Sequence, residues 1–234
     1  KSGMSVLDIG ANIGYYALIE LKLIGKKGSL VAVEPSKDNL KLLKKNLIFN
    51  GYHNVEIHNK AISDKNGYRN LFMSEMSNLN TFHDTGTGTL NLTGKKIKVE
   101  TMTVPEIMNG KKLDLIRMDV EGHEVEILNG LLPAIKNNLF SPMIIFETHL
   151  SRYNEKHNME KSLRNFFNLG YKVKLVGSSS INGTKIIEKK GYISDLSIKS
   201  DGEERKIFEN IKNEDSINMI CFEGGIRTVL LKKN

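Results

Sequence analysis

Acids and glycines near the start of the chain form the first pattern that could carry chemistry. Asp8, Gly10, Asn12 and Gly14 occupy alternate positions after a short apolar run, and Glu34 follows a second apolar run. Glycines let a turn approach a ligand closely, and an acid about 20 residues beyond such a turn accepts hydrogen bonds from ribose hydroxyls in nucleoside-binding folds. The pattern therefore predicts a nucleoside-binding loop followed by a ribose-binding acid.

This loop lacks the features of two common phosphate-binding loops. A dehydrogenase loop has the pattern G-x-G-x-x-G, and its second and third glycine positions, counted from Gly10, hold Asn12 and Tyr15. A P-loop needs Gly-Lys-Ser/Thr, which does not follow the turn either. The acid before the turn suits instead a ligand with an ammonium group, which Asp8 could hold directly or through water.

A second group of acids and histidines follows two later apolar runs. Asp119, Glu121, His123 and Glu124 come directly after one run, and His149 follows the next. Because such groups can take a proton from a substrate, Asp119, Glu121 and His149 are the candidate general bases. Two plainer interpretations stay open: Glu121 could only stabilise the N-terminus of the following helix, and His149 could only be hydrogen-bonded. We expect His123 to pack or to cap that helix.

A metal centre is not favoured by the sequence. Asp119 and Glu147 end successive runs and could share Mg²⁺, but hard ions usually take more ligands than these two. A zinc helix motif is excluded at His123 and Glu124, since Ile127 stands where the second histidine is expected. No constellation is apparent around the remaining histidines, which are His53, His58, His83 and His157.

Alternating strands and helices must position these groups. Sheet strands are expected at residues 6–9, 29–33, 55–57, 113–118, 143–146 and 171–176, with a seventh at either 219–222 or 228–231. Further strands are expected at 68–73 and 97–103, helices at 13–24, 37–50, 104–107, 125–131, 156–169 and 202–214, and a loop at 177–182. This order predicts an α/β fold with a doubly wound, mainly parallel, Rossmann-like sheet of about seven strands that binds its ligand at the strands' carboxyl ends.

Length and composition fit one domain over residues 1–234, with residues 77–94, rich in Ser, Thr, Asn and Gly, as a surface loop or lid. The single cysteine, Cys221, excludes an intrachain disulfide. A net charge of +7 could favour an anionic partner, but the lysines are scattered and aromatics are only 7% of residues, which disfavours a nucleic-acid surface.

We find no membrane-spanning run or signal peptide and expect a cytoplasmic protein. The first strand starts almost at Lys1, which leaves room for an upstream substrate-capping segment.

Two stretches together resemble class I S-adenosylmethionine-dependent methyltransferases, and within them the FkbM family. The first is Val-Leu-Asp-Ile-Gly-Ala-Asn-Ile-Gly with the later Val-Ala-Val-Glu-Pro, and the second is Leu-Asp-Leu-Ile-Arg-Met-Asp-Val-Glu-Gly-His-Glu-Val-Glu-Ile-Leu-Asn-Gly, residues 113–130. The resemblance covers roughly residues 5–176, and residues 177–234 form a divergent C-terminal part.

The resemblance implies the cofactor, the site and the reaction. The cofactor-binding residues would be Asp8, Gly10, Asn12 and Gly14 around the methionine part, Glu34 on the ribose, and Ala61 and Ile62 against adenine. The reaction would be O-methylation of a sugar, glycan or secondary-metabolite hydroxyl, with S-adenosylmethionine as cofactor and Mg²⁺ not favoured. The alternatives are an RNA or protein methyltransferase and a non-catalytic cofactor-binding module.

Overall fold

The structure is a computed structural model that describes residues 1–83 and 92–233. The chain divides into two compact units, residues 1–141 and residues 142–234. The first unit holds the glycine turn, Glu34 and Asp119, and the second holds His149. None of the helices in the described ranges has the length and apolarity needed to cross a membrane.

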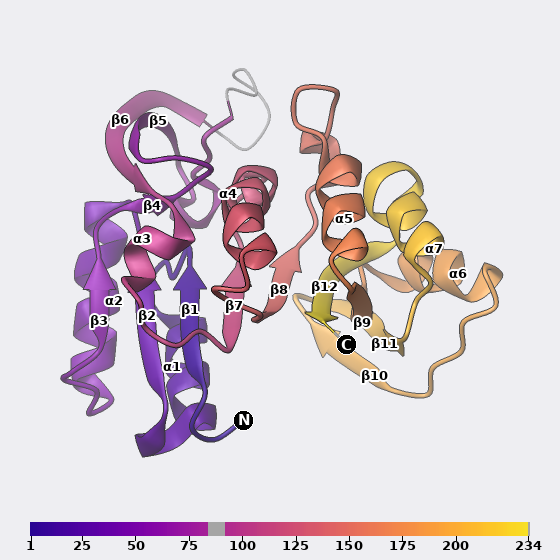
Figure 1. The fold of residues 1–234 in the computed structure, drawn as a ribbon, viewed down its shortest axis with the longest axis horizontal. Coiled ribbons are helices and arrows are strands. Elements are labelled where there is room, and N and C mark those ends of the chain that lie inside the picture. The colour runs from indigo at the N-terminus through magenta and orange to yellow at the C-terminus, as the bar shows by residue number, and fades with distance from the viewer. Residues whose placement is uncertain (84–91, 234) are drawn as a thin grey trace. The chain divides into compact units, whose positions relative to one another are not determined.

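A parallel sheet forms the centre of the first unit (Figure 1). Its order is β7-β1-β2-β3, with β1 at Ser5–Ile9, β2 at Ser29–Val33, β3 at Glu56–His58 and β7 at Leu115–Met118. All three pairings are parallel, and the register places Asp8 of β1 beside Arg117 of β7. Every residue of β1 is buried, as expected for a strand covered on both faces.

Helices cover both faces of this sheet. α1 (Tyr15–Ile24) and α2 (Lys37–Phe49) pack on Val6, Leu30 and Ala32, whereas the alternate residues of β1 and β2 are buried on the other face. α3 (Val104–Met108) and α4 (Glu124–Lys136) lie on that second face (Figure 1). The start of α2 is capped as its sequence predicts, since the Ser36 side chain accepts a hydrogen bond from the Asn39 N–H.

A small second sheet adjoins the predicted excursion at residues 77–94. Its order is β4-β6-β5, with β4 at Ala61–Ile62, β5 at Gly67–Ser74 and β6 at Leu92–Met102. A short 3-10 helix at Ser77–Leu79 and a bridge between Phe72 and Thr81 follow β5. The excursion is therefore ordered at both ends, and its residues 84–91 lie outside the described ranges.

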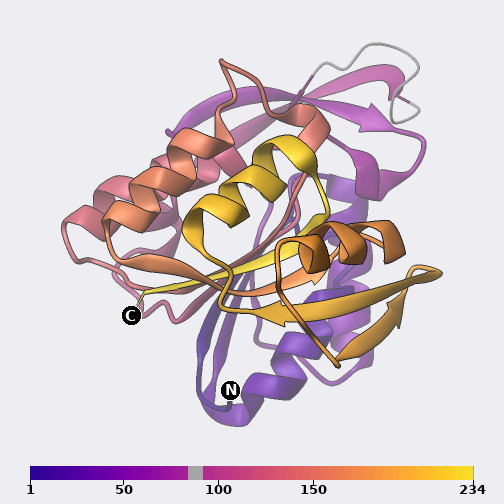
Figure 2. The same ribbon diagram turned by 90° about the vertical axis from the view of Figure 1, so that its right-hand side faces the viewer.

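The second unit contains a five-stranded sheet. Its order is β10-β11-β9-β12-β8, with β8 at Met143–Glu147, β9 at Tyr171–Ser178, β10 at Ser197–Ser200, β11 at Glu203–Glu209 and β12 at Ile226–Lys233. β12 is antiparallel to both β8 and β9, so β8 and β9 run in the same direction. α5 (Met159–Asn168) and α7 (Asn213–Asn218) lie side by side against β9, and α6 (Ile181–Lys189) packs on β9 and β11 (Figure 2).

The α/β class is as predicted, but the part after residue 177 differs from the prediction. The expected helix at 202–214 is mainly strand β11, because pairing with β9 and β10 overrides the helix propensity of its Glu, Arg and Lys residues. The expected loop at 177–182 instead contains the end of β9 and the start of α6. β10 and β11 raise the strand number above the seven expected.

The structure decides between the two candidates for the seventh strand. Residues Thr228–Leu231 lie in β12, as one alternative had it. Residues 219–222 are helical instead, since they belong to the helical segment Met219–Glu223 that follows α7.

Candidate functional site

One cavity of about 220 Å³ lies at the carboxyl ends of β1, β2 and β7 in the first unit. This is where an open parallel sheet binds ligands. Its walls come from the glycine turn, the end of β2, strand β4, the segment before residue 84 and the loop after β7. Of the predicted site residues, the cavity brings together Gly10, Asn12, Glu34, Ala61, Ile62, Asp119 and Glu121.

A close approach between the glycine turn and the loop after β7 explains why residue 10 is a glycine. Gly10 has φ of 76°, and a Cβ at that position would lie 2.4 Å from the Asp119 carbonyl oxygen. Gly14 has φ of 93° and caps the N-terminus of α1, where a Cβ would lie 2.6 Å from Leu43 Cδ1 of α2. Gly10 thus brings the two halves of the site together, whereas Gly14 packs α1 against α2 and does not line the cavity.

The Glu34 carboxylate is held in place by the turns around it. Its Oε2 accepts from the Asn12 N–H at 2.9 Å, and its Oε1 accepts from the Ser36 N–H at 2.8 Å and from Asn39 Nδ2 at 3.4 Å. The residue is 4% exposed, and burial raises the pKa of its carboxyl to about 7 against the lowering effect of these hydrogen bonds. Oε2 retains a lone pair for one further donor.

Asp8 is paired inside the protein. Its side chain is fully buried, does not line the cavity and lies 3.3 Å from Arg117 Nη1, while Arg117 Nη2 lies 3.1 Å from Asp119 Oδ2. The guanidinium also sits 4.0 Å from the centre of the Tyr16 ring. Asp8 therefore does not line the cavity itself, and its predicted role toward a ligand ammonium, directly or through water, stays a prediction.

Glu20 of α1 is a further carboxyl group close to Asp8 and Arg117. It is 8% exposed, and burial, with the nearby Asp8, raises the pKa of its carboxyl to about 9. Sequence reasoning missed both Arg117 and Glu20. The available signal was a cation within an apolar strand and an acid on a mainly apolar helix, since a buried charge needs a partner.

Asp119 and Glu121 both reach the cavity from the loop after β7. The Asp119 side chain is 32% exposed and held by Arg117. Glu121 has φ of 52°, which is uncommon for a non-glycine residue, and its carbonyl accepts a hydrogen bond from Thr81 Oγ1 at 2.9 Å. Such backbone strain, of order 1–3 kcal/mol, is common at ligand sites.

His123 packs, as expected. It is 1% exposed, its ring lies 4.6 Å from that of Phe82, and its Nε2 lies 3.0 Å from Ser63 Oγ. Burial lowers the pKa of its imidazole to about 4, so the ring is neutral near pH 7. His123 therefore forms part of the cavity wall.

An apolar wall faces the end of β2. Ala61 and Ile62 are 4% and 1% exposed, and they line the cavity together with Leu71 and Phe82. The apolar surface of this wall suits a flat, weakly polar ring.

His149 and Glu147 belong to the second unit. The backbone N–H of His149 donates to the Tyr153 hydroxyl at 3.0 Å. Glu147 Oε1 lies 3.1 Å from Arg227 Nε, so its carboxylate is engaged by a cation of its own unit. The role predicted for His149 stays a prediction.

The parallel sheet, the glycine turn after β1 and the acid after β2 are those of a class I methyltransferase fold. Residues 8–173 match the model of the Methyltransferase FkbM domain. The chain belongs to this family.

Individual proteins resemble this chain either over a short stretch or at low sequence identity. A protein-L-isoaspartate O-methyltransferase of Methanococcus vannielii is 40% identical over 24% of this chain and 26% of its own length. A Jannaschia sp. (strain CCS1) protein described as a methyltransferase is 25% identical over 71% of this chain and 61% of its own. The crystal structure of methyltransferase FkbM from Methylobacillus flagellatus KT aligns with a TM-score of 0.47 at 16% identity, over 89% of this chain and 43% of that one. The chain thus spans less than two thirds of each of these proteins.

Proposed function

We propose that this protein binds S-adenosylmethionine in the cavity of the first unit and transfers its methyl group to a hydroxyl oxygen of a sugar, glycan or secondary metabolite. One observation carries the proposal: Glu34 and Asp119, an acid suited to ribose and an acid suited to proton transfer, line the same cavity.

The residues present fit this cofactor. Glu34 Oε2 has a free acceptor site for a ribose hydroxyl, and Ala61 and Ile62 offer an apolar surface for adenine. Within the described ranges, the buried Asn12 Oδ1 has no hydrogen-bond partner, so it is available to an N–H or O–H group of a ligand. Gly10 keeps the turn free of a side chain where it meets the loop after β7.

The ion pairs beside the cavity support a role for Asp119. Asp8 and Asp119 both contact Arg117, which lines the cavity together with Asp119. Arg117 also fixes the position of the Asp119 carboxylate. Asp119 Oδ2 is held by the ion pair with Arg117, and Oδ1 can face the cavity. We assign Arg117 and Asp8 as positioning residues.

S-adenosylmethionine held by these residues would supply a methyl group on a sulfonium, and the thioether S-adenosylhomocysteine would be the leaving group. Asp119 accepts the hydroxyl proton, with Glu121 as the second candidate from the same loop. A positioned base of this kind contributes roughly 10²- to 10⁴-fold in rate. The cavity walls hold the reactants in line, and such alignment can contribute about 7–11 kcal/mol. His149 remains a third candidate base, and no metal is part of this proposal.

The choice of oxygen as acceptor rests on the family resemblance and on the names of two relatives. Both curated relatives with the higher identities, from Methanococcus vannielii and Archaeoglobus fulgidus, are protein-L-isoaspartate O-methyltransferases, each similar over 24% of this chain. An RNA acceptor is the alternative that the net charge of +7 favours.

Transfer of labelled methyl groups to pools of glycans, small metabolites, RNA and protein tests the proposal. We expect label in a glycan or metabolite pool, in a product that withstands mild alkali as a methyl ether does. Label released as methanol by alkali would indicate a carboxyl acceptor. Label only in RNA or protein would refute the hydroxyl assignment. Binding of S-adenosylhomocysteine with no transfer to any pool would indicate a non-catalytic module.

A further inference from the structure

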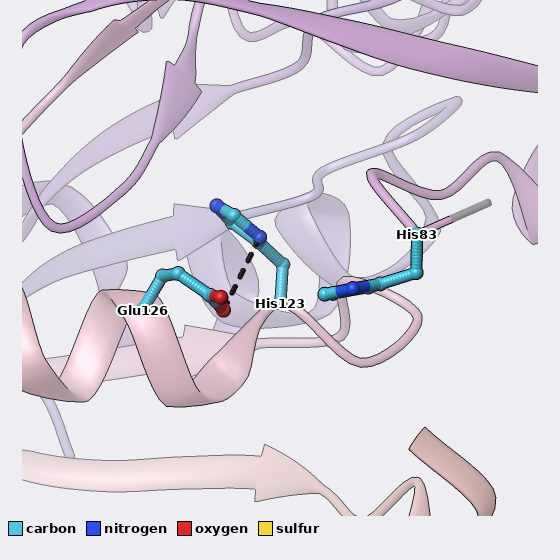
Figure 3. A group of neighbouring side chains, drawn as sticks. All are labelled: His83, His123 and Glu126. Atoms are coloured by element: carbon cyan, nitrogen blue, oxygen red, sulfur yellow. Dashed lines mark ion pairs between the residues drawn. The ribbon is translucent and has the colours of Figure 1, made fainter. Parts of the chain in front are cut away.

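Two histidines and a glutamate of the first unit lie together: His83 comes from one segment, and His123 and Glu126 come from the start of α4 (Figure 3). His83 follows the Thr81 bridge, His123 precedes α4, and Glu126 lies in its first turn. One ligand atom from each lies within 4.8 Å of the others. Figure 3 shows His83 and Glu126 extending toward His123, whose ring centre is 5.8 Å from that of His83.

Hydrogen bonds around Ser63 determine which nitrogen of His123 carries the proton. Burial raises the pKa of the Asp64 carboxyl, but the hydrogen bond from Ser63 and the pair with Arg69 at 2.7 Å outweigh it and keep the pKa below its usual value, so the carboxylate can only accept. Ser63 therefore donates its one hydroxyl proton to Asp64 Oδ1 at 3.0 Å. The contact of 3.0 Å between Ser63 Oγ and His123 Nε2 then requires Nε2–H as the donor.

The lone pair of His123 Nδ1 consequently faces a carboxylate. Nδ1 lies 3.4 Å from Glu126 Oε2 and, among the described residues, has no hydrogen-bond partner. Two acceptors at this separation repel each other unless a cation lies between them. A proton on Nδ1 would provide one, but it would charge an imidazole that is 1% exposed.

We propose that His83, His123 and Glu126 bind one divalent transition-metal ion, with Zn²⁺ as the ion that best suits two imidazoles and a carboxylate. In a tetrahedral site with Zn–N and Zn–O bonds of about 2.05 Å, ligand atoms lie about 3.3 Å apart. The Nδ1 to Oε2 distance of 3.4 Å matches this edge. Water takes the fourth position.

Hydrogen bonds from neighbouring groups hold the proposed ligands in place, as is usual around metal ions in proteins. Ser63 accepts from the outer nitrogen of His123, which fixes the ring and its tautomer. The backbone N–H of His83 donates to Thr81 Oγ1 at 3.2 Å, which fixes the chain at His83, and Thr81 Oγ1 in turn donates to the Glu121 carbonyl. A metal here would tie the segment before residue 84 to α4 and so hold one wall of the cavity. The proposal does not depend on the methyl-transfer proposal.

Metal binding by chelator-treated full-length protein tests the site. We expect one Zn²⁺ per chain by elemental analysis after gel filtration, and a visible absorption band when Co²⁺ is added instead. Glu126→Gln and His83→Gln should each weaken Zn²⁺ at least tenfold in competition with a chromophoric chelator. Ser63→Ala, which frees the His123 ring, should weaken it by about 10- to 100-fold.

His58→Gln is the matched control, because His58 forms a comparable pair with Glu56 at 2.8 Å but belongs to no three-ligand group among the described residues. It should bind Zn²⁺ like the wild type. Circular dichroism verifies that each variant is folded. A folded wild-type chain that retains no stoichiometric metal would overturn the proposal. So would Glu126→Gln and His83→Gln variants that both bind Zn²⁺ as tightly as the wild type.

Discussion

Replacing Glu34 by glutamine tests the ribose assignment most directly. The change keeps the side-chain volume but removes the charge and turns one acceptor oxygen into a donor, in a place where Asn12 and Ser36 already donate. Hydrogen bonds to a charged group contribute about 1.5–3 kcal/mol. Loss of this amount corresponds to roughly 10- to 150-fold weaker binding of S-adenosylhomocysteine.

The pKa of Glu34 adds a second, independent signature. Burial raises it to about 7 in the free protein, so below pH 7 the carboxyl is mainly protonated and accepts less well from ribose hydroxyls. The ionised fraction falls about tenfold between pH 8 and pH 6, and the affinity should fall by about the same factor. Glu34→Gln should abolish this pH dependence, because the amide does not titrate.

Isothermal titration calorimetry at pH 6, 7 and 8 measures both effects. Glu56→Gln serves as the control, since Glu56 is an acid on the neighbouring strand β3 that does not line the cavity. Thermal unfolding shows whether the variant remains folded, because a buried N–H without an acceptor costs about 1–3 kcal/mol of stability. A folded Glu34→Gln protein with wild-type affinity and an unchanged pH dependence would refute the assignment.

Three further outcomes follow from the same geometry. Asp119→Asn should retain S-adenosylhomocysteine binding and lose at least about 100-fold in turnover; near-full turnover would remove Asp119 as the base. Arg117→Met should lower the free energy of unfolding in urea by about 3–5 kcal/mol, because it leaves Asp8 buried without its cation, and a smaller loss would mean that Asp8 is neutral. Gly10→Ala should lose roughly 1–3 kcal/mol from its φ of 76° alone and more from the 2.4 Å approach to Asp119, and an unchanged melting temperature would contradict that geometry.

Local patterns were sufficient for much of the first unit. The turn after β1, the Ser36 cap of α2 and the short helix α3 with its C-cap Asn109, whose φ is 44°, all follow from residues close together in the chain. Glycine, capping and apolar periodicity are local properties, and they identify strand ends without knowledge of the fold. Glu34 and Asp119 could therefore be selected as cavity residues from the sequence.

Pairings between distant residues were not accessible in this way. Strand β11 is a strand because β9 lies beside it, and its own residues favour a helix. The pairing of Asp8 with Arg117 was not predicted for a similar reason: Arg117 lies 109 positions away and becomes its neighbour only through the parallel pairing of β1 and β7.

The sequence by itself determined the nucleotide-type turn, the acids after two strands and the α/β class, because each depends on short-range spacing along the chain. Only the tertiary structure decided that Asp8 is neutralised from within, and that His83 joins His123 and Glu126. The physical reason is that charge pairing and metal-ligand geometry depend on distances of a few ångströms between atoms, and folding creates these between segments that the chain keeps far apart.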